Sequence, residues 1–483
     1  MGTNGCGQGK QTAPPVLTVD TATLGPVLPQ DYLGLSFESS VLESPLLDPG
    51  HSDLPAFLRD LGVGRLRFGG NSLDRVTAWT PDPASPLPSW AHGRVTPEDL
   101  RRLGVLSAAT GWRVDLGLTL GHPDATAAAD ETAAARRLIG AGLGTVEIGN
   151  EPDLFAGNPA LKPAGYTYQQ YRSDVDRYRT AITGAAPDVA FAGPDTAGLD
   201  WLASYGHDEH DGLAFLTQHF YPLTRCGSSH PTIADLESPA TTRRQQQVAD
   251  AAVATARGEG LGVRLDETNS ASCGGQDGVS NTLASALWIV NYLLGAAKHG
   301  VSGVDVHGGL AACRGYTPLC VPGAKGPVAG SSPGIDPVAD ASLGAGPSET
   351  GRLAAQPDFY GLLFVHQLEG GRWLSLRLDR STPLDAFAVQ MRDGSVRVAL
   401  INPDPHFTGT LTIHIAGHRG TASVLRLTGP SLGATAPIQF GGSQVAGDGT
   451  WEARPGDHLS TTAAGVPVDI GPASAVLVTL PPT

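Results

Sequence analysis

The sequence TVEIGNEPD, residues 145–153, decides how the rest of the chain is interpreted. Its apolar residues predict a short buried strand. Pro152 predicts that the strand ends there, because proline has no backbone donor and disfavours helix in the residue before it. Asn150 and Glu151 are therefore expected at a strand tip. In a parallel α/β barrel, the C-terminal strand ends are the place where reactive groups are held.

A second stretch of the same kind, VRLDETNS at residues 263–270, ends near Glu267. Two glutamates on separate strand tips suggest the carboxyl pair of a retaining glycosidase, with one group protonating the leaving oxygen and the other attacking the anomeric carbon. We predict that Glu151 is the acid/base and Glu267 the nucleophile. Strand alternation predicts that only one of Asp266 and Glu267 faces the pocket, and that Asp266 pairs with Arg264.

The two carboxyl groups need different environments for this chemistry. The acid must be protonated near neutral pH, so Glu151 needs a pKa raised by burial and by the neighbouring carboxylate. The nucleophile must stay ionised, and Arg67 on another strand tip is the expected partner of Glu267.

Strand and helix patterns alternate from Tyr32 to His307 and give eight strand candidates, at residues 32–38, 65–72, 113–121, 145–153, 189–193, 214–221, 263–270 and 301–307. Such alternation indicates a parallel α/β architecture, and eight units indicate a (β/α)8 TIM barrel. We assign residues 30–372 to this catalytic barrel. Ala311–Gln356, rich in Gly, Pro, Ala and Ser, is expected to lie over the barrel mouth.

From Trp373 the hydrophobic period changes to two, which predicts an all-β sandwich domain over residues 373–483. The strand or strands within residues 15–29 have no role in a barrel and are expected to pair with this sandwich. Residues 1–14 are polar and glycine-rich, which predicts a disordered tail.

Composition limits the classes of partner. The formal charge of −15 on 483 residues disfavours nucleic acid and long sulfated polyanions. Without an apolar run of about 18 residues, no membrane span is expected. Neither a CxxC pair nor a histidine cluster suggests a metal, and no cofactor is expected. Only four lysines occur among many arginines and alanines, a bias typical of high-GC bacterial genomes.

The cysteines and the N-terminal residues indicate in which cellular compartment the protein is found. Cys313 and Cys320 close a short loop and could pair, and Cys226 and Cys273 each follow a strand end and could meet; Cys6 would be left over. Free thiols in a cytosolic enzyme are the alternative. The first residues lack the apolar segment of a signal peptide, so the protein is expected to be cytoplasmic, or secreted or periplasmic if such a peptide has been removed.

Several short motifs accompany the two glutamates: LRFGGNS (66–72), HFYPL (219–223), ETNS (267–270), the glycines 274–275, GVS (278–280) and GYTP (315–318). Together with Asn-Glu-Pro they resemble glycoside hydrolase family 79, the β-glucuronidase and heparanase family among clan A retaining glycosidases. One departure is Ala271-Ser272-Cys273, where similar members often carry a sugar-contacting aromatic.

The resemblance implies a retaining exo-β-D-glucuronidase that acts on a glucuronide or a glucuronic-acid-containing glycan. Asn150 would bind the sugar 2-hydroxyl and Tyr221 would orient the nucleophile. Gly315 and Tyr316 would receive the uronate carboxylate through backbone N–H groups and the phenol. The remaining predicted substrate-binding residues are Asn71, Arg67, Ser36 and His219.

Two alternatives stay open. One is a related clan A exo-glycosidase for a neutral sugar such as a xyloside or glucoside. The other is a non-catalytic carbohydrate-binding protein on a degenerate barrel. An endo-acting heparanase-like role fits the net acidity less well. Three tryptophans could stack on sugar rings or pack in the core: Trp79, Trp90 and Trp201.

Overall fold

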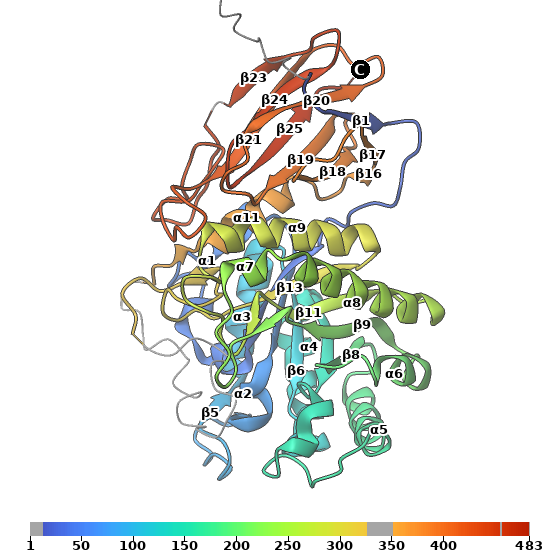
Figure 1. Cartoon of the computed structure of the whole chain (residues 1–483). Coiled ribbons are helices and arrows are strands. Elements are labelled where there is room, and N and C mark those ends of the chain that lie inside the picture. Colours follow the sequence, from blue (N-terminus) through green and yellow to red (C-terminus); the bar gives the residue numbers. More distant parts are fainter. Residues whose placement is uncertain (1–12, 326–350, 455, 483) are drawn as a thin grey trace, which may run out of the picture.

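The computed structural model describes residues 13–325, 351–454 and 456–482. It consists of a barrel and a β-sandwich, with helices packed between them (Figure 1). Cys6, most of the predicted N-terminal tail and the central part of the predicted loop over the barrel mouth lie outside the described residues. Among those residues, no helix is both long enough and apolar enough to cross a membrane.

Eight parallel strands close the barrel in the order β11-β13-β2-β3-β6-β7-β8-β9. Almost every residue in them is buried, as expected for parallel strands covered on both faces. This architecture confirms the prediction of a (β/α)8 barrel. The strands are β2 (Leu33–Glu38), β3 (Arg65–Gly69), β6 (Arg113–Leu118), β7 (Leu143–Ile148), β8 (Phe191–Thr196), β9 (Leu213–Phe220), β11 (Val263–Thr268) and β13 (Gly303–His307).

Helices cover the barrel, and local sequence signals set their ends. The helix α3 begins with a capping box between Thr96 and Asp99 and stops at Gly111, whose φ of 79° suits glycine. The longer helices are α1 (Leu54–Asp60), α3 (Pro97–Thr110), α4 (Ala125–Leu138), α5 (Tyr168–Ala185), α6 (Leu202–Asp208), α8 (Pro239–Gly258), α9 (Leu283–His299) and α11 (Pro357–His366).

Two sheets form the sandwich. The larger has the order β16-β18-β19-β25-β21-β22, with β23 paired to β21, and the smaller has the order β17-β1-β20-β24. Their strands are β1 (Val16–Asp20), β16 (Arg372–Trp373), β17 (Ser375–Leu378), β18 (Asp385–Gln390), β19 (Val396–Asn402), β20 (Gly409–Ile415), β21 (Thr421–Thr428), β22 (Gln439–Phe440), β23 (Asp457–Ser460), β24 (Val466–Ile470) and β25 (Ser474–Leu480).

The N-terminal strand β1 lies far from its sheet partners in sequence. It pairs antiparallel with β17 and parallel with β20. Apolar side chains of the two sheets, such as Val19, Ile413 and Val478, form the core between them. The outer face of the larger sheet joins the barrel core through α9 and α11, which lie between the two domains in Figure 1.

Candidate active site

Glu151 lies in a sharp turn just after β7. Gly149 has φ 84°, and Glu151 itself has φ 50° and ψ 51°. A left-handed conformation costs a non-glycine residue roughly 1–2 kcal/mol, so it persists only where the surroundings enforce it. Here the Glu151 N–H donates to the Asp195 carbonyl at 2.8 Å. The turn places a side chain that is 17% exposed at the end of the fourth barrel strand.

The side chains of the two predicted catalytic glutamates, Glu151 and Glu267, lie close together. A carboxylate oxygen of Glu151, one of Glu267 and a ring nitrogen of His219 all lie within 4.8 Å of one another. His219 Nδ1 is 3.3 Å from Glu151 Oε1. In retaining glycosidases the carboxyl groups are about 5–5.5 Å apart, whereas inverting enzymes need about 6.5–9.5 Å. The observed spacing therefore suits a double displacement.

Two donors hold the Glu267 carboxylate, one on each oxygen. Arg67 Nη1 donates to Oε2 at 2.7 Å, and the Tyr221 hydroxyl donates to Oε1 at 2.9 Å. Burial by itself would raise the pKa of Glu267, but His307, His219, Arg67 and the Tyr221 hydroxyl outweigh it and hold this pKa below its ordinary value. Burial lowers the pKa of His307, so we assign most of the stabilising positive charge to Arg67 and His219.

Strict alternation along β11 fails, which corrects one expectation. Asp266 and Glu267 both approach the Arg67 guanidinium, with Asp266 Oδ2 3.7 Å from Nε. The reason is a register shift in β11 next to both of its neighbours, which turns consecutive side chains toward the same interior. Arg264 does not pair with Asp266; it forms an ion pair with Asp305 at 2.5 Å.

Arg67 is the centre of a buried charge cluster that the sequence analysis did not find. Besides Asp266 and Glu267, it lies 3.2 Å from Glu147 and 3.8 Å from Asp195. Burial, followed by the charge of Asp195, raises the pKa of Glu147, and burial, followed by Asp266, raises the pKa of Asp195 to about 7. For Glu147 the available signal was a charged residue inside the predicted strand 145–153, since a buried charge requires a partner. Asp195 lies beyond the predicted strand 189–193 and gave no such signal.

Histidine and carboxylate atoms converge here in two groups: Glu151 with His219 and Glu267, and Asp195 with His219 and Asp266. Such sets resemble metal ligands in composition. Arg67 contacts Glu267 directly and lies within ion-pair distance of Asp195 and Asp266. A fixed positive charge therefore already stands where a cation would have to bind.

Asn150 presents an unused donor beside the two glutamates. Its Oδ1 accepts from Arg67 Nη2 at 3.0 Å, and its backbone N–H donates to Asp74 at 2.7 Å. Its Nδ2 has no hydrogen-bond partner among the described residues. A buried amide without a partner costs about 1–3 kcal/mol, which suits a group that binds a ligand hydroxyl. Asn71 and Glu151 line the same small hollow.

Three of the predicted substrate-binding residues are almost completely buried. Arg67 and Ser36 have no exposed surface, and His219 is 1% exposed. The Ser36 hydroxyl lies 3.1 Å from His307 Nδ1 and accepts from Arg67 at 3.4 Å. In this structure Arg67 and His219 contact the catalytic carboxylates directly, and their contact with a substrate stays a prediction.

The predicted uronate-binding loop is engaged by the protein itself. The Gly315 N–H donates to Asp277 Oδ1 at 2.7 Å, and Asp277 also forms an ion pair with Arg314 at 3.0 Å. Tyr316 is 1% exposed and stacks on Tyr221 with a centroid distance of 6.0 Å. In this conformation the Gly315 N–H is not free to receive a ligand carboxylate.

The segment that departs from the family motif, Ala271-Ser272-Cys273, is held by a disulfide bond. The strand β12 (Ala271–Ser272) pairs with β10 (Leu223–Thr224). Disulfides join Cys226 to Cys273 and Cys313 to Cys320, which are the two pairings considered from the sequence. The first of them crosslinks the loop after Tyr221 to the loop after Glu267. This crosslink stands where an aromatic was expected.

Of the three tryptophans, Trp201 packs against the core, whereas Trp79 and Trp90 line a cavity. Trp201 stacks on buried Tyr171 with centroids 5.3 Å apart. Trp90 stacks on His122 at 4.2 Å, and with Trp79 both line a cavity of about 450 Å³ that also contains Glu131. Burial raises the pKa of Glu131 to about 8.

Glu131 provides a stability prediction. Its folded pKa lies above its unfolded value, so the fold loses stability as pH rises from about 4.3 to the folded pKa. We expect Glu131→Gln to raise the free energy of unfolding by about 3 kcal/mol at pH 8, with little effect at pH 4. Urea denaturation at the two pH values measures this. An equal gain at both would contradict the buried neutral carboxyl.

Known proteins share this fold. No protein-family model matches the chain. A curated β-glucuronidase from Aspergillus niger is 27% identical over 195 residues, so the match spans only 36% of this chain and 36% of that relative. A 4-O-α-L-rhamnosyl-β-D-glucuronidase structure from Fusarium oxysporum 12S superposes with a TM-score of 0.76 at 18% identity, covering 96% of this chain and 100% of that one.

A GH51 arabinofuranosidase from Xanthomonas axonopodis pv. citri gives a TM-score of 0.68 at 13% identity, over 97% of this chain and 99% of that one. At these identities the likeness concerns the fold. The chain thus has the barrel-plus-sandwich fold of structures described as a glucuronidase and an arabinofuranosidase.

Proposed function

We propose that the protein is a retaining exo-β-D-glucuronidase of the family 79 type that releases terminal β-linked glucuronic acid from glycans or glucuronides. One observation carries the proposal: oxygens of Glu151 and Glu267, from the tips of the fourth and seventh barrel strands, lie within 4.8 Å. Glu267 is held ionised, as a nucleophile requires, and the Glu151 side chain is 17% exposed, so a leaving group and water can reach it.

The reaction follows from this geometry. The Glu267 carboxylate attacks the anomeric carbon while Glu151 gives its proton to the glycosidic oxygen, and the aglycone leaves as an alcohol. Glu151, now ionised, takes a proton from water, whose oxygen displaces Glu267 from the sugar. Asn150 Nδ2 supplies a donor for a sugar hydroxyl. Tyr221 and Arg67 release some of their hold on Glu267 as its charge moves onto the bond.

The choice of glucuronic acid rests on the family motifs, supported by the names of the Aspergillus niger relative and the Fusarium oxysporum structure. We further propose a secreted or periplasmic location, which two disulfides support because such bonds persist in oxidising compartments.

The principal alternative is an exo-glycosidase for a neutral sugar. The contact that favours it is the hydrogen bond from the Gly315 N–H to Asp277. A protein carboxylate at this position would repel a substrate carboxylate and would not oppose a hydroxymethyl group.

Matched aryl glycosides separate the two functions. We expect kcat/KM for 4-nitrophenyl β-D-glucuronide to exceed that for the β-D-glucoside by at least about 100-fold, because a site built for a polar group rejects an analogue without it. NMR of the first product should show the β anomer, as retention requires. Equal or faster cleavage of the glucoside would defeat the substrate assignment, and a first-formed α anomer would defeat the mechanism.

Asp277 gives a second discriminating variant. We expect Asp277→Asn to lower KM for the glucuronide by about tenfold, because it removes a negative charge beside the substrate carboxylate. The glucoside should serve as the control, with KM unchanged. Steady-state kinetics on both substrates measures this. Unchanged kinetics on the glucuronide would show that the carboxylate binds elsewhere.

A further inference from the structure

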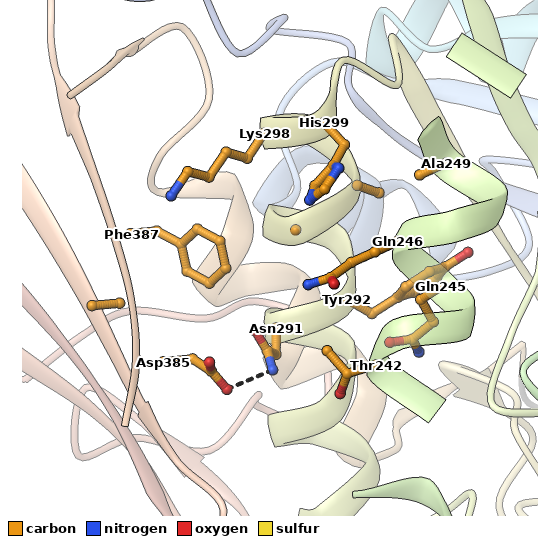
Figure 2. Close-up of a pocket in the computed structure, with 13 residues that line it drawn as sticks. Thr242, Gln245, Gln246, Ala249, Asn291, Tyr292, Lys298, His299, Asp385 and Phe387 are labelled. Atoms are coloured by element: carbon orange, nitrogen blue, oxygen red, sulfur yellow. Dashed lines mark hydrogen bonds between the residues drawn. The ribbon is translucent and has the colours of Figure 1, made fainter. Parts of the chain in front are cut away.

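A cavity of about 390 Å³ lies where the barrel meets the sandwich, between α8, α9 and β18 (Figure 2). Its volume falls within the range of small-molecule sites. The side chains that line it are mostly polar and come from three elements: Gln245 and Gln246 on α8, Asn291 and Lys298 on α9, and Asp385 and Phe387 on β18. None of them belongs to the site around Glu151 and Glu267.

One wall holds an unused buried donor. Gln245 is 8% exposed, and its Nε2 has no hydrogen-bond partner in the described part of the chain. A desolvated amide N–H₂ without a partner is unfavourable unless a ligand or water completes it. Figure 2 shows the Gln245 and Gln246 side chains reaching from α8 toward α9. Amide groups both donate and accept, which matches the hydroxyls of a sugar.

The cavity also has charged groups in its lining. The Lys298 ammonium lies 5.7 Å from the Phe387 ring centroid. Among the described lysines, Lys162 forms an ion pair with Asp174, whereas Lys298 forms none. Along β18, Asp385 accepts a hydrogen bond from Asn291 at 2.8 Å. The cavity therefore offers an anion-binding group at Lys298, an apolar ring face at Phe387 and hydroxyl-binding groups elsewhere.

We propose that this cavity is an accessory, non-catalytic site for an acidic saccharide of one or two rings. Lys298 receives the carboxylate, Gln245 and Gln246 bond the hydroxyls, and the apolar edge of the sugar packs against Phe387. This assignment rests on the cavity alone and does not depend on the reaction at Glu151. The site lies at the barrel–sandwich junction, apart from the strand tips that carry Glu151 and Glu267.

Binding of sodium D-glucuronate tests the proposal. In soaked crystals of the wild type we expect the sugar between α8, α9 and β18. In titration calorimetry we expect Gln245→Met and Lys298→Met each to weaken this binding by about tenfold, as the loss of one hydrogen bond or one charge contact predicts. Gln247→Met is the matched control, because this exposed α8 residue does not line the cavity, and it should bind as the wild type does.

Three outcomes overturn the assignment: an empty cavity in the soaked crystals, unchanged affinity in both variants, or an equal loss in Gln247→Met. D-glucose that binds the cavity as tightly as D-glucuronate refutes the role of Lys298. If Gln245→Met does not fold, as judged by its melting temperature, the exposed Lys298→Met carries the test. Density beside Glu267 in the same crystals reports separately on the proposed glucuronidase function.

Discussion

Glu267→Ala is expected to lower kcat on an aryl β-glucuronide by roughly 10⁵-fold, the size of effect seen when a catalytic nucleophile is removed. The carboxylate that attacks the anomeric carbon is then absent, while the surrounding barrel is retained. Glu259→Ala, a change at the end of α8 on a side chain that is 29% exposed, is the matched control and should keep wild-type kcat. Activity of Glu267→Ala within tenfold of the wild type would refute its role.

Azide distinguishes the roles of the two glutamates. In Glu267→Ala, azide can fill the vacated space, attack from the nucleophile's face and give the α-glucuronosyl azide. In Glu151→Ala, an activated aryl glucuronide still forms the covalent intermediate. Azide then attacks from the opposite face, where no base is needed, and gives the β-glucuronosyl azide. NMR of the products reads the configuration. The same azide anomer from both variants would show that the assignments are wrong.

Arg67→Met is expected to produce the largest loss of stability. Arg67 has no exposed surface and lies within ion-pair distance of Glu147, Asp195, Asp266 and Glu267. Removing one partner of a buried ion pair leaves uncompensated charge and costs about 3–5 kcal/mol. Urea denaturation at pH 7 measures the loss. A loss below about 1 kcal/mol would show that the cluster is already neutralised by bound protons.

The same variant should change the pH profile. Arg67 helps to hold the pKa of Glu267 below its ordinary value. Their pairing therefore stabilises the fold above the unfolded pKa of about 4.3, and the contribution is lost as pH falls toward the lowered folded pKa. Because kcat/KM requires ionised Glu267, its acid limb should move to higher pH in Arg67→Met.

Arg264→Met separates stability from this electrostatic role. Arg264 is also buried in the barrel and pairs with Asp305 at 2.5 Å, so its removal should also cost stability. It donates to neither Glu151 nor Glu267, and the acid limb should stay in place. An identical shift of the acid limb in both variants would show that the change in Arg67→Met reflects general loosening of the barrel.

Most of the fold could be predicted from local patterns in the sequence. The period-two and period-3.6 patterns, with turns between them, predict eight barrel strands and the sandwich, because burial on a strand or helix face depends on neighbours along the chain. Pro152 and the glycines mark strand ends in the same way. The placement of the two glutamates on the fourth and seventh strands follows from counting these units.

Contacts between distant segments could not be predicted in this way. The shift in β11 that turns Asp266 and Glu267 to one side depends on the pairing of β11 with β9 and β13. The hydrogen bond from Gly315 to Asp277 joins two loops whose approach no local pattern reports. The partner of Glu147 and Asp195 could not be predicted, because only the closed barrel places both near Arg67.

By itself, the sequence determined the alternation of strands and helices and the two acidic strand tips, because these depend on residue type and spacing over a few residues. Tertiary structure alone decided which charges meet. It surrounded Arg67 with four carboxylates and engaged the Gly315 N–H. At the domain junction it left Gln245 Nε2 without a hydrogen-bond partner among the described residues and placed Lys298 over the Phe387 ring. The physical reason is that electrostatic energy depends on distance in space, which chain closure sets and local sequence does not.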